Sequence, residues 1–540
     1  MSPVAPPPVR TELYTHWGDG STVAARWHEA QRDTMSLHLV ALSAGVPPPP
    51  LLGAGRLADW LAGVNAPGVY HHSADGGRLR LSLWVGEWER LLPELRLQAD
   101  AVVLGDGAWA TGPQALALCK ALTRCARRGT TLRAATVEPV ALQALAPVLQ
   151  ATGWQAPTDA TSAWQWHPTW TIKTDREPWR TWVRPAGHCA VVGAGIAGAA
   201  VAAALARQGW SVQVLDVGDD VAAGASSLPV GLATEYRSAD DAPLSRLTRQ
   251  GVRALNAAAR TLLVEGRDWA PSGAQELPLG GAPGAWSSQP EACWVKPRAL
   301  VQAWMATAGV QFQGNATVHT VQRDGAAWCL RDAQGAVVAR ADRVVLAAAS
   351  GVADLLVQSP DLRDAGAGRG WPPLHTVRGL VSWGRHNVPE TRPFPVQPVH
   401  GNGSLIAQVP FSDGARWFVG ASYQPVHVGE PEWPDDKNHG ANALRLEKLA
   451  PALFAALTPA LEAGTLQAWK GQRCVTGDRM PLVGPVAAQL PDVWVCAGFG
   501  SRGLSLVAVC AELLASQWSG QPWPLPASLA QLLLPYRKRQ

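Results

Sequence analysis

Three glycines and one aspartate have the types and spacing needed to bind a dinucleotide. The run from Gly193 to Gly198 reads Gly-Ala-Gly-Ile-Ala-Gly, and Asp216 follows 23 residues after Gly193. The first glycine permits a tight turn, the second lets the backbone approach a pyrophosphate, and the third allows close packing of helix on strand. The N–H groups at the helix start then face the phosphates, and the carboxylate accepts hydrogen bonds from the adenosine ribose. The cofactor-binding residues predicted here are Gly193, Gly195, Ile196, Ala197, Gly198 and Asp216.

A second glycine-rich turn, near the C-terminus, favours one dinucleotide over another. The acid alone is compatible with FAD or NAD, because both have an unphosphorylated adenosine ribose. The apolar run Val493–Ala497 leads into Gly498–Leu504 and then into a predicted helix that ends near Trp518. In flavin oxidases such an element brings a helix N-terminus near the flavin, where the dipole stabilises the anionic reduced form. We therefore predict FAD, with further cofactor contacts from Gly498, Gly500, Ser501, Arg502, Gly503 and Leu504.

The elements that must position these residues are those of a Rossmann-type unit. Cys189–Val192 and Ser211–Leu215 are short apolar runs typical of strands, and an alanine-rich helical stretch lies between them. This βαβ opening, the long middle of the chain and the glycine-rich closing helix predict an FAD-binding domain interrupted by a second subdomain.

An earlier section of the chain predicts a separate α/β domain. Leu79–Val85 shows the alternation of a strand, and Ala101–Leu104 resembles a buried parallel strand that opens into a loop. A helical stretch from Pro113 to Ala126 and a further strand, Thr131–Ala135, follow. Strand, helix and strand in this order indicate an α/β fold.

Length and composition restrict the class of protein. At 540 residues the chain is long enough for two or three domains, and 47% hydrophobic with 16% charged residues excludes wholesale disorder. A net charge of +4 permits an RNA partner without requiring one. The eight cysteines form no Cys-x-x-Cys pair, no histidine cluster has metal spacing, and the apolar run Ala190–Ala206 is short for a membrane span. The sequence therefore predicts a soluble, cytoplasmic protein with no metal and no membrane partner.

The glycine-rich motifs together resemble a known family of flavoproteins. Their order is similar to that in the FAD-dependent half of the bacterial bifunctional tRNA 5-methylaminomethyl-2-thiouridine biosynthesis proteins (MnmC-like), a half related to glycine/D-amino-acid oxidases. The resemblance covers essentially Gly187 to Gln540 and implies further cofactor contacts from Ala225 and Ser226. The motifs that carry it are Gly193–Gly198, Gly224–Ser227, Gly420–Tyr423, Gly471–Gly484 and Gly498–Leu504.

This resemblance implies a reaction and a substrate. It implies removal of the carboxymethyl group from 5-carboxymethylaminomethyl-2-thiouridine at the wobble position of a tRNA anticodon, which leaves 5-aminomethyl-2-thiouridine. The group removed is a glycine joined through its nitrogen. Our hypothesis is that its Cα gives a hydride to flavin N5, and that the resulting imine hydrolyses to glyoxylate and a primary amine. Oxygen is the expected electron acceptor.

The same resemblance implies that two arginines hold the substrate carboxylate. Arg473 and Arg502 stand where similar amino-acid oxidases carry their substrate-side arginines, and a guanidinium meets a carboxylate through two parallel hydrogen bonds. We predict both as catalytic-site residues. The alternative for each is a structural role, which for Arg473 would be an ion pair. Relatives also have a tyrosine where this chain has Ala407. Tyr423 is either its replacement or an ordinary strand tyrosine of the core.

The first section resembles the methyltransferase half of the same proteins but lacks the residues that half needs. Gly18-Asp-Gly20 replaces the glycine loop with no apolar strand before it, and no acid follows the strand Leu37–Leu42. The acidic loop expected after the strand Ala101–Leu104 is also altered, around Asp106. A missing acid leaves ribose hydroxyls unpaired, at about 1–3 kcal/mol per lost buried partner. We expect neither S-adenosylmethionine (SAM) binding nor methylation.

The fold class expected is therefore α/β. A degenerate class I methyltransferase-like domain (1–167) and a linker (168–186) precede a glycine/D-amino-acid oxidase-like domain (187–540). Its FAD-binding parts are expected at about 187–270 and 470–540, with the substrate subdomain mostly between. Two other functions remain open. One is a small-molecule amine oxidase for glycine or sarcosine, and the other is a tRNA-binding protein in which FAD is only structural.

Overall fold

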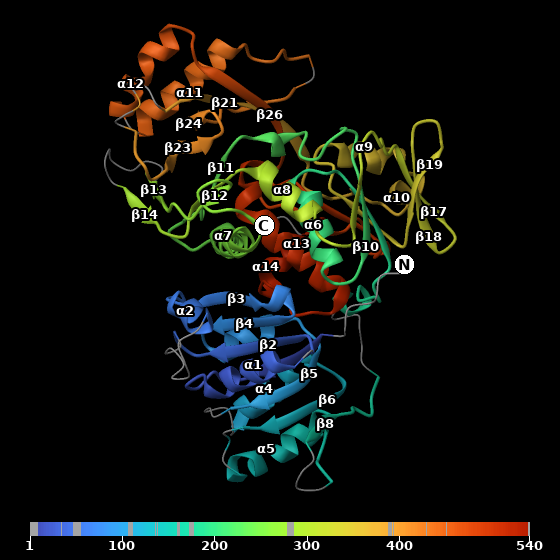
Figure 1. The fold of residues 1–540 in the computed structure, drawn as a ribbon. Coiled ribbons are helices and arrows are strands. Elements are labelled where there is room, and N and C mark those ends of the chain that lie inside the picture. The colour runs from blue at the N-terminus through green and yellow to red at the C-terminus, as the bar shows by residue number, and fades with distance from the viewer. Residues whose placement is uncertain are drawn as a thin grey trace. The chain divides into compact units, whose positions relative to one another are not determined.

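The larger part of the chain is described by a computed structural model. It describes residues 9–33, 35–46, 56–105, 112–135, 137, 139–158, 163–171, 178–277, 286–386, 391, 394–427, 429–449 and 451–537. The chain divides into two compact units, blue to teal and green to red in Figure 1. The smaller consists of Ser2–Pro185 with Ala515–Gln531, and the larger mostly of Ala186–Leu514 with Leu532–Gln540.

The smaller unit is a doubly wound α/β sheet, as expected for a methyltransferase-like section. Its strand order is β3-β4-β2-β1-β5-β6-β8-β7, with β3 and β8 antiparallel to their neighbours β4 and β6. The chain winds from β1 outward to β4 and then crosses to β5, so the order reverses between β1 and β5. The bounds are β1 (Arg10–Tyr14), β2 (Leu37–Ser43), β3 (Gly68–Ala74), β4 (Leu79–Val85), β5 (Ala99–Leu104), β6 (Ala126–Ala134), β7 (Trp154–Gln155) and β8 (Trp164–Trp166), with helices α1 (Ser21–Arg32), α2 (Arg56–Ala62), α4 (Gly112–Cys125) and α5 (Pro139–Ala151).

Strand β1 corrects one expectation. No apolar strand was expected before Gly18, yet β1 lies in the middle of the sheet, parallel to β2 and β5. Buried Glu12 is neutralised by Arg10 Nε at 2.7 Å and by Arg26 of α1 at 3.0 Å, and it accepts the Tyr14 hydroxyl at 3.1 Å. The prediction was wrong because a strand with paired charges gives no apolar run.

The larger unit contains the predicted dinucleotide-binding sheet. Five parallel strands in the order β16-β10-β9-β20-β28 are extended by antiparallel β27. Most of α6 is buried, which explains its alanine and glycine content, because small side chains let the helix lie close to the sheet. The middle of the chain supplies β16 and β20 to this sheet. The bounds are β9 (His188–Val192), α6 (Ile196–Ala206), β10 (Ser211–Leu215), β16 (Val310–Gln313), β20 (Arg343–Leu346), β27 (Leu482–Pro485), β28 (Val493–Ala497) and α13 (Gly503–Ser519).

A second large sheet, mostly antiparallel, lies in the part of the chain where a substrate subdomain is expected, and its strands β23 and β24 are orange in Figure 1. Its order is β14-β13-β22-β23-β24-β21-β25, and long β26 pairs with β21. Helices α7 and α11 supply further residues around the site. The bounds are β11 (Gly231–Ala233), α7 (Pro243–Leu262), β13 (Ala274–Glu276), β14 (Ser287–Gln289), β21 (Leu374–Arg385), β22 (Val399–Gly401), β23 (Gly403–Phe411), β24 (Gly414–Gly420), β25 (Gln424–Pro425), α11 (Asp435–Leu449) and β26 (Gln467–Thr476).

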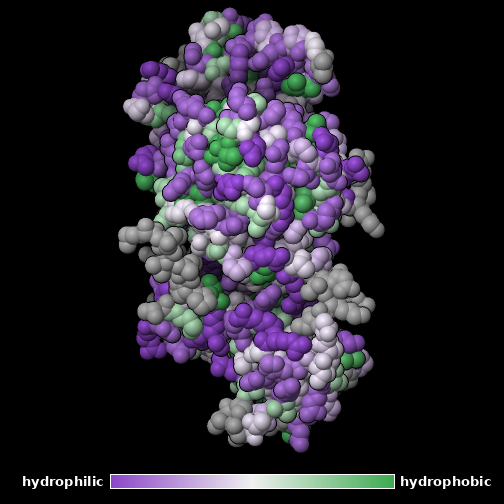
Figure 2. Space-filling view, turned by 90° about the vertical axis from the view of Figure 1, so that its right-hand side faces the viewer, coloured by the Kyte–Doolittle hydropathy of each residue, from purple (hydrophilic) through white to green (hydrophobic). Residues whose placement is uncertain are grey.

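Among the described residues, the helices lack the combination of length and apolar character that a bilayer crossing requires. On the face drawn in Figure 2, hydrophobic residues lie in small separate groups within a mainly hydrophilic surface.

Candidate active site

A cavity of about 1760 Å³ in the larger unit brings together nearly all predicted site residues. Pockets for single small ligands measure about 300–1,000 Å³, so this one has room for a dinucleotide and a substrate together. Of the predicted residues, Gly198 alone is not part of the wall. The wall includes Gly193, Gly195, Ile196, Ala197, Asp216, Ala225, Ser226, Arg473, Gly498, Gly500, Ser501, Arg502, Gly503 and Leu504.

The glycine turn between β9 and α6 has the geometry that a dinucleotide requires. Gly193 has φ +112°, and a Cβ there would lie 2.6 Å from the carbonyl oxygen of Ala347. A Cβ on Gly198 would lie 1.8 Å from the carbonyl oxygen of Gly193, so α6 packs directly against the turn. Gly195 lines the cavity, and a Cβ there would lie 3.4 Å from Ser226 Oγ. These contacts exclude side chains at Gly193 and Gly198 and fit the turn to a pyrophosphate.

Asp216 and Ser226 hold this turn in place as well as lining the cavity. Asp216 Oδ2 accepts the Ala194 N–H at 2.6 Å, and Oδ1 accepts the Gly218 N–H at 2.8 Å. Ser226 Oγ accepts the Ile196 N–H at 2.8 Å. An ionised carboxylate has about four lone-pair sites, so Asp216 retains acceptor capacity for ribose hydroxyls.

The C-terminal glycine turn reaches the same cavity from the other end of the sequence. Gly498 (φ +78°) and Gly500 (φ +57°) form the turn between β28 and α13. Ser505, at the start of α13, accepts the Thr234 N–H at 3.1 Å and donates to the Thr234 carbonyl at 2.9 Å. This pair of bonds joins the start of α13 to the loop after β11. The glycine turns at Gly193 and Gly498 both line the one cavity.

Arg473 and Arg502 line this cavity, and neither has an acidic partner among the described residues. Arg473, on β26, donates to Ser501 Oγ at 2.8 Å and to the Ser422 carbonyl at 2.7 Å. The guanidinium carbon of Arg502 lies 5.1 Å from the centre of the Tyr236 ring. No carboxylate of the described residues forms an ion pair with either arginine. The structure therefore gives no support to the ion-pair alternative for Arg473.

Burial lowers the pKa of both guanidinium groups. For Arg473 burial is the main cause, opposed by Tyr423 and reinforced by repulsion from Arg445. For Arg502 burial is again the main cause, followed by repulsion from Arg479. A buried positive charge that lacks a neutralising group is costly, so these arginines favour an anionic ligand.

Two tyrosines stand beside these arginines. Tyr423 is 42% exposed and lines the cavity, so its interpretation as a core tyrosine was wrong. The guanidinium carbon of Arg473 lies 5.5 Å from its ring centre. Tyr236 was missed by sequence analysis, because it belongs to a loop with no motif of its own. Leu228 also lines the cavity.

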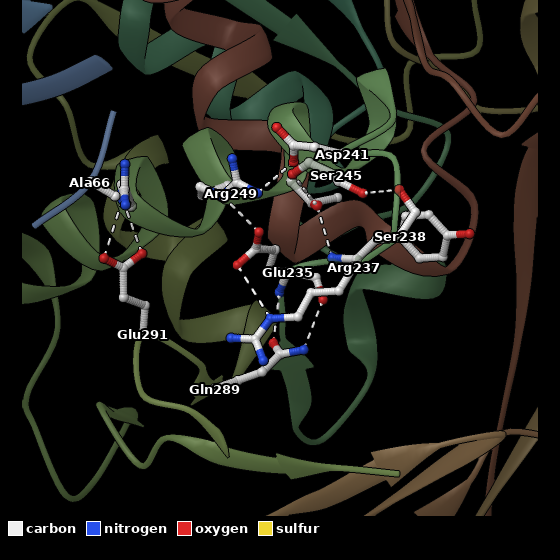
Figure 3. Close-up of polar contacts among 12 residues, drawn as sticks. Ala66, Glu235, Arg237, Ser238, Asp241, Ser245, Arg249, Gln289 and Glu291 are labelled. Atoms are coloured by element: carbon white, nitrogen blue, oxygen red, sulfur yellow. Dashed lines mark hydrogen bonds and ion pairs between the residues drawn. The ribbon is translucent and has the colours of Figure 1, made fainter. Parts of the chain in front are cut away.

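The loop that carries Tyr236 is held by a polar network, shown in Figure 3. Gln289 accepts the Glu235 N–H at 3.0 Å through Oε1 and donates to the Glu235 carbonyl at 3.0 Å through Nε2. Arg249 Nε donates to the Glu235 carboxylate at 2.7 Å, and Thr248 Oγ1 accepts the Tyr236 N–H at 2.8 Å. The position of Tyr236 is therefore fixed by side chains of α7 and β14.

Comparison with known proteins agrees with this geometry. The family model described as FAD dependent oxidoreductase (DAO) matches residues 188–273 and 255–517. A tRNA 5-methylaminomethyl-2-thiouridine biosynthesis bifunctional protein MnmC from Albidiferax ferrireducens is 41% identical, over 96% of this chain and 92% of its own length. The protein of the same name from Polaromonas sp. (strain JS666) is 37% identical, over 97% of this chain and 90% of its own length.

Solved structures confirm the fold of the larger unit. Glycine oxidase from Geobacillus kaustophilus superposes with a TM-score of 0.51 at 20% identity, over 65% of this chain and 99% of that one. L-proline dehydrogenase from P. horikoshii gives a TM-score of 0.50 at 16% identity, over 66% of this chain and 98% of that one. At these identities the likeness concerns the fold alone.

Proposed function

This chain belongs to the FAD-dependent oxidoreductases and, within them, to the bacterial tRNA 5-methylaminomethyl-2-thiouridine biosynthesis bifunctional proteins, and on that basis we propose its reaction. It is an enzyme that oxidises a CH–NH group. It removes the carboxymethyl group from 5-carboxymethylaminomethyl-2-thiouridine at the tRNA wobble position and leaves 5-aminomethyl-2-thiouridine. Its working place is the cytoplasm, where the tRNA is found.

The observation that carries this proposal is the convergence of a dinucleotide cradle and unpaired guanidinium groups on one cavity. The turns at Gly193 and Gly498 would hold FAD, and Asp216 would accept hydrogen bonds from its adenosine ribose. When bound, FAD supplies a two-electron acceptor for the C–H bond beside the substrate nitrogen. Oxidation makes that carbon–nitrogen bond an imine, which water hydrolyses to glyoxylate and the primary amine that remains on the tRNA.

The protein's own contribution is to bind and orient the glycine-like group. Arg473 and Arg502 hold its carboxylate, because bidentate guanidinium–carboxylate bonds fix both position and direction. Ser501 and the Ser422 carbonyl orient Arg473, and the Tyr236 ring lies beside Arg502. Tyr423 takes the place of the tyrosine that this chain lacks at Ala407. A neutral amine needs no dedicated base, since it can lose hydride directly.

One experiment separates this function from its alternatives. The purified, FAD-loaded protein is mixed without oxygen with tRNA that carries the carboxymethylaminomethyl group, or with free glycine or sarcosine, and flavin absorbance is followed. We expect bleaching by the tRNA and none by the free amino acids. Bleaching by glycine or sarcosine alone indicates a small-molecule oxidase. Bound flavin that no substrate bleaches indicates a tRNA-binding protein with structural FAD.

The smaller unit does not bind SAM in this proposal. Ligands of doubly wound sheets bind where the strand order reverses, here at the carboxyl ends of β1 and β5. What supports this is the close approach of the two strand ends: the Gly105 N–H donates to Thr15 Oγ1 at 3.2 Å, and a Cβ on Gly105 would lie 2.7 Å from the Cβ of His16. Buried Trp17 covers Gly20, where a Cβ would lie 2.8 Å from the indole. The altered acidic loop around Asp106 lies outside the described residues.

A further inference from the structure

Arg445 is a cavity-lining cation that the oxidation of a glycine-like group does not require. It lies on α11, next to the turn that joins β22 to β23. Its guanidinium donates a long hydrogen bond of 3.4 Å to Asn402 Oδ1, and the part of the chain that the structure describes offers it no ion pair. Burial alone lowers the pKa of Arg445, with no contribution from an acid.

The backbone around Arg445 is shaped to admit this side chain. Gly403, the first residue of β23, has φ +114°. A Cβ on Gly403 would lie 3.4 Å from Arg445 Cβ and 3.5 Å from its Cδ. The aliphatic stem of Arg445 therefore lies against bare backbone, and its charged end remains at the cavity wall.

Positive charge exceeds negative charge at this end of the cavity. Arg445 repels Arg473, so the two guanidinium groups share one electrostatic environment. Of the acids in the wall, Glu235 is paired with Arg249 at 2.7 Å, whereas Glu276 accepts from the neutral amide of Gln289 at 2.7 Å and keeps its charge. The wall as a whole has five arginines (Arg237, Arg445, Arg473, Arg479 and Arg502) and four acids (Asp216, Glu235, Glu276 and Asp354). Because arginines outnumber acids in the wall, the cavity favours a ligand that carries negative charge.

The carboxymethyl group brings a single carboxylate, which Arg473 and Arg502 already accommodate. A nucleotide within RNA adds a phosphodiester on each side of its ribose, and arginine is a common partner of phosphate oxygens. We propose that Arg445 binds a phosphodiester adjacent to the modified uridine and thereby makes the cavity selective for RNA over free amino acids. This inference rests on the proposed function and adds to it the residue that recognises a polyanion.

The test compares two substrates that differ in phosphate. Full-length, FAD-loaded Arg445→Gln and wild-type enzyme are assayed with carboxymethylaminomethyl-modified tRNA and with the corresponding free nucleoside. We expect the KM for tRNA to rise about tenfold in the variant, with kcat, the flavin spectrum and the KM for the nucleoside unchanged. The slope of log KM against log salt for tRNA should fall by about 0.7, the value for one phosphate of a single strand.

Two further variants serve as controls. Arg445→Lys keeps the charge and should restore most of the affinity for tRNA. Lys448→Gln removes an exposed charge from the same helix, outside the cavity wall, and should leave the KM for tRNA unchanged.

Three outcomes would overturn the inference. An equal rise of KM for tRNA and nucleoside would assign Arg445 to the carboxylate, and an unchanged KM for tRNA would remove it from the site. An equal effect of Lys448→Gln would indicate general attraction of RNA. Each leaves the proposed function intact, whereas wild-type enzyme bleached by neither tRNA nor nucleoside would overturn both.

Discussion

At the scale of residues, the orientation of Arg473 depends on neutral oxygens. Ser501 Oγ and the Ser422 carbonyl each accept one of its N–H groups, at 2.8 and 2.7 Å, and the remaining donors are left for a carboxylate. A lysine keeps the charge but cannot form the bidentate arrangement. We expect Arg473→Lys to lower kcat/KM for modified tRNA about 100-fold, close to 3 kcal/mol, while FAD stays bound.

The control for Arg473→Lys is Arg298→Lys. Arg298 is an exposed arginine that pairs with Asp220 outside the cavity wall. Stopped-flow flavin reduction measures both variants. An unaltered rate of flavin reduction in Arg473→Lys would mean that the carboxylate is held elsewhere.

His400 makes the stability of the larger unit dependent on pH. Burial, aided by repulsion from Arg237, lowers the pKa of His400 from 6.5 to about 4. Between these values the unfolded chain binds a proton that the folded protein does not, so stability falls as pH decreases from 6.5 towards 4. The shift corresponds to about 3 kcal/mol when the pH has passed below 4.

The prediction for His400 is tested by denaturant unfolding at pH 7 and pH 4.5. His400→Gln removes the titrating group, so this variant should lose less stability than the wild type on acidification. His427→Gln, at an exposed position of the same unit, should behave as the wild type. Parallel pH curves for His400→Gln and wild type would contradict the assignment.

At the scale of elements, helix α7 positions the C-terminal glycine turn by direct backbone contact. A Cβ on Gly251 would lie 1.8 Å from the Ser505 carbonyl oxygen, so α7 touches the first turn of α13. Ser505 also bonds Thr234. We expect Gly251→Ala to displace α13, to destabilise the protein by about 1–3 kcal/mol, and to weaken FAD retention.

The matched substitution for Gly251→Ala is Gly440→Ala in helix α11, where a Cβ meets nothing within 4 Å. That change should be neutral or stabilise by up to about 1 kcal/mol, because alanine is the better helix former. Thermal unfolding and the flavin fraction after gel filtration measure both. If Gly251→Ala retains FAD as well as Gly440→Ala, the contact between α7 and α13 does not support the site.

At the scale of the whole molecule, the two units differ in the space that they leave at their candidate ligand sites. The larger has a cavity of about 1760 Å³ at its glycine turns, whereas in the smaller Thr15 and His16 lie close to Gly105, where the strand order reverses. We expect calorimetric titration of the full chain with SAM to show no binding in the micromolar range, in a sample that retains FAD. A heat of binding with a dissociation constant in the micromolar range would show that the ends of β1 and β5 leave room for SAM.

The glycine turns of the proposed FAD site could be predicted from the sequence because the requirements of such turns are local. The turn at Gly193 needs three glycines at set intervals between a strand and a helix, since backbone geometry and the approach of a pyrophosphate permit nothing larger. The acid at Asp216 and the turn at Gly498 have similar fixed relations to their strands. The fold class of the larger unit follows from these same motifs.

Only the tertiary structure decided which charges are left without partners at the cavity wall. Arg473 and Arg445 differ from paired arginines because no described acid bonds them, and this depends on how strands and helices distant in sequence pack. Tyr236 reaches the cavity through bonds from α7 and β14, and the buried Glu12 of β1 is neutralised by Arg10 and by Arg26 of α1. Hydropathy and motif spacing report neighbours along the chain, whereas electrostatic neutralisation depends on neighbours in space.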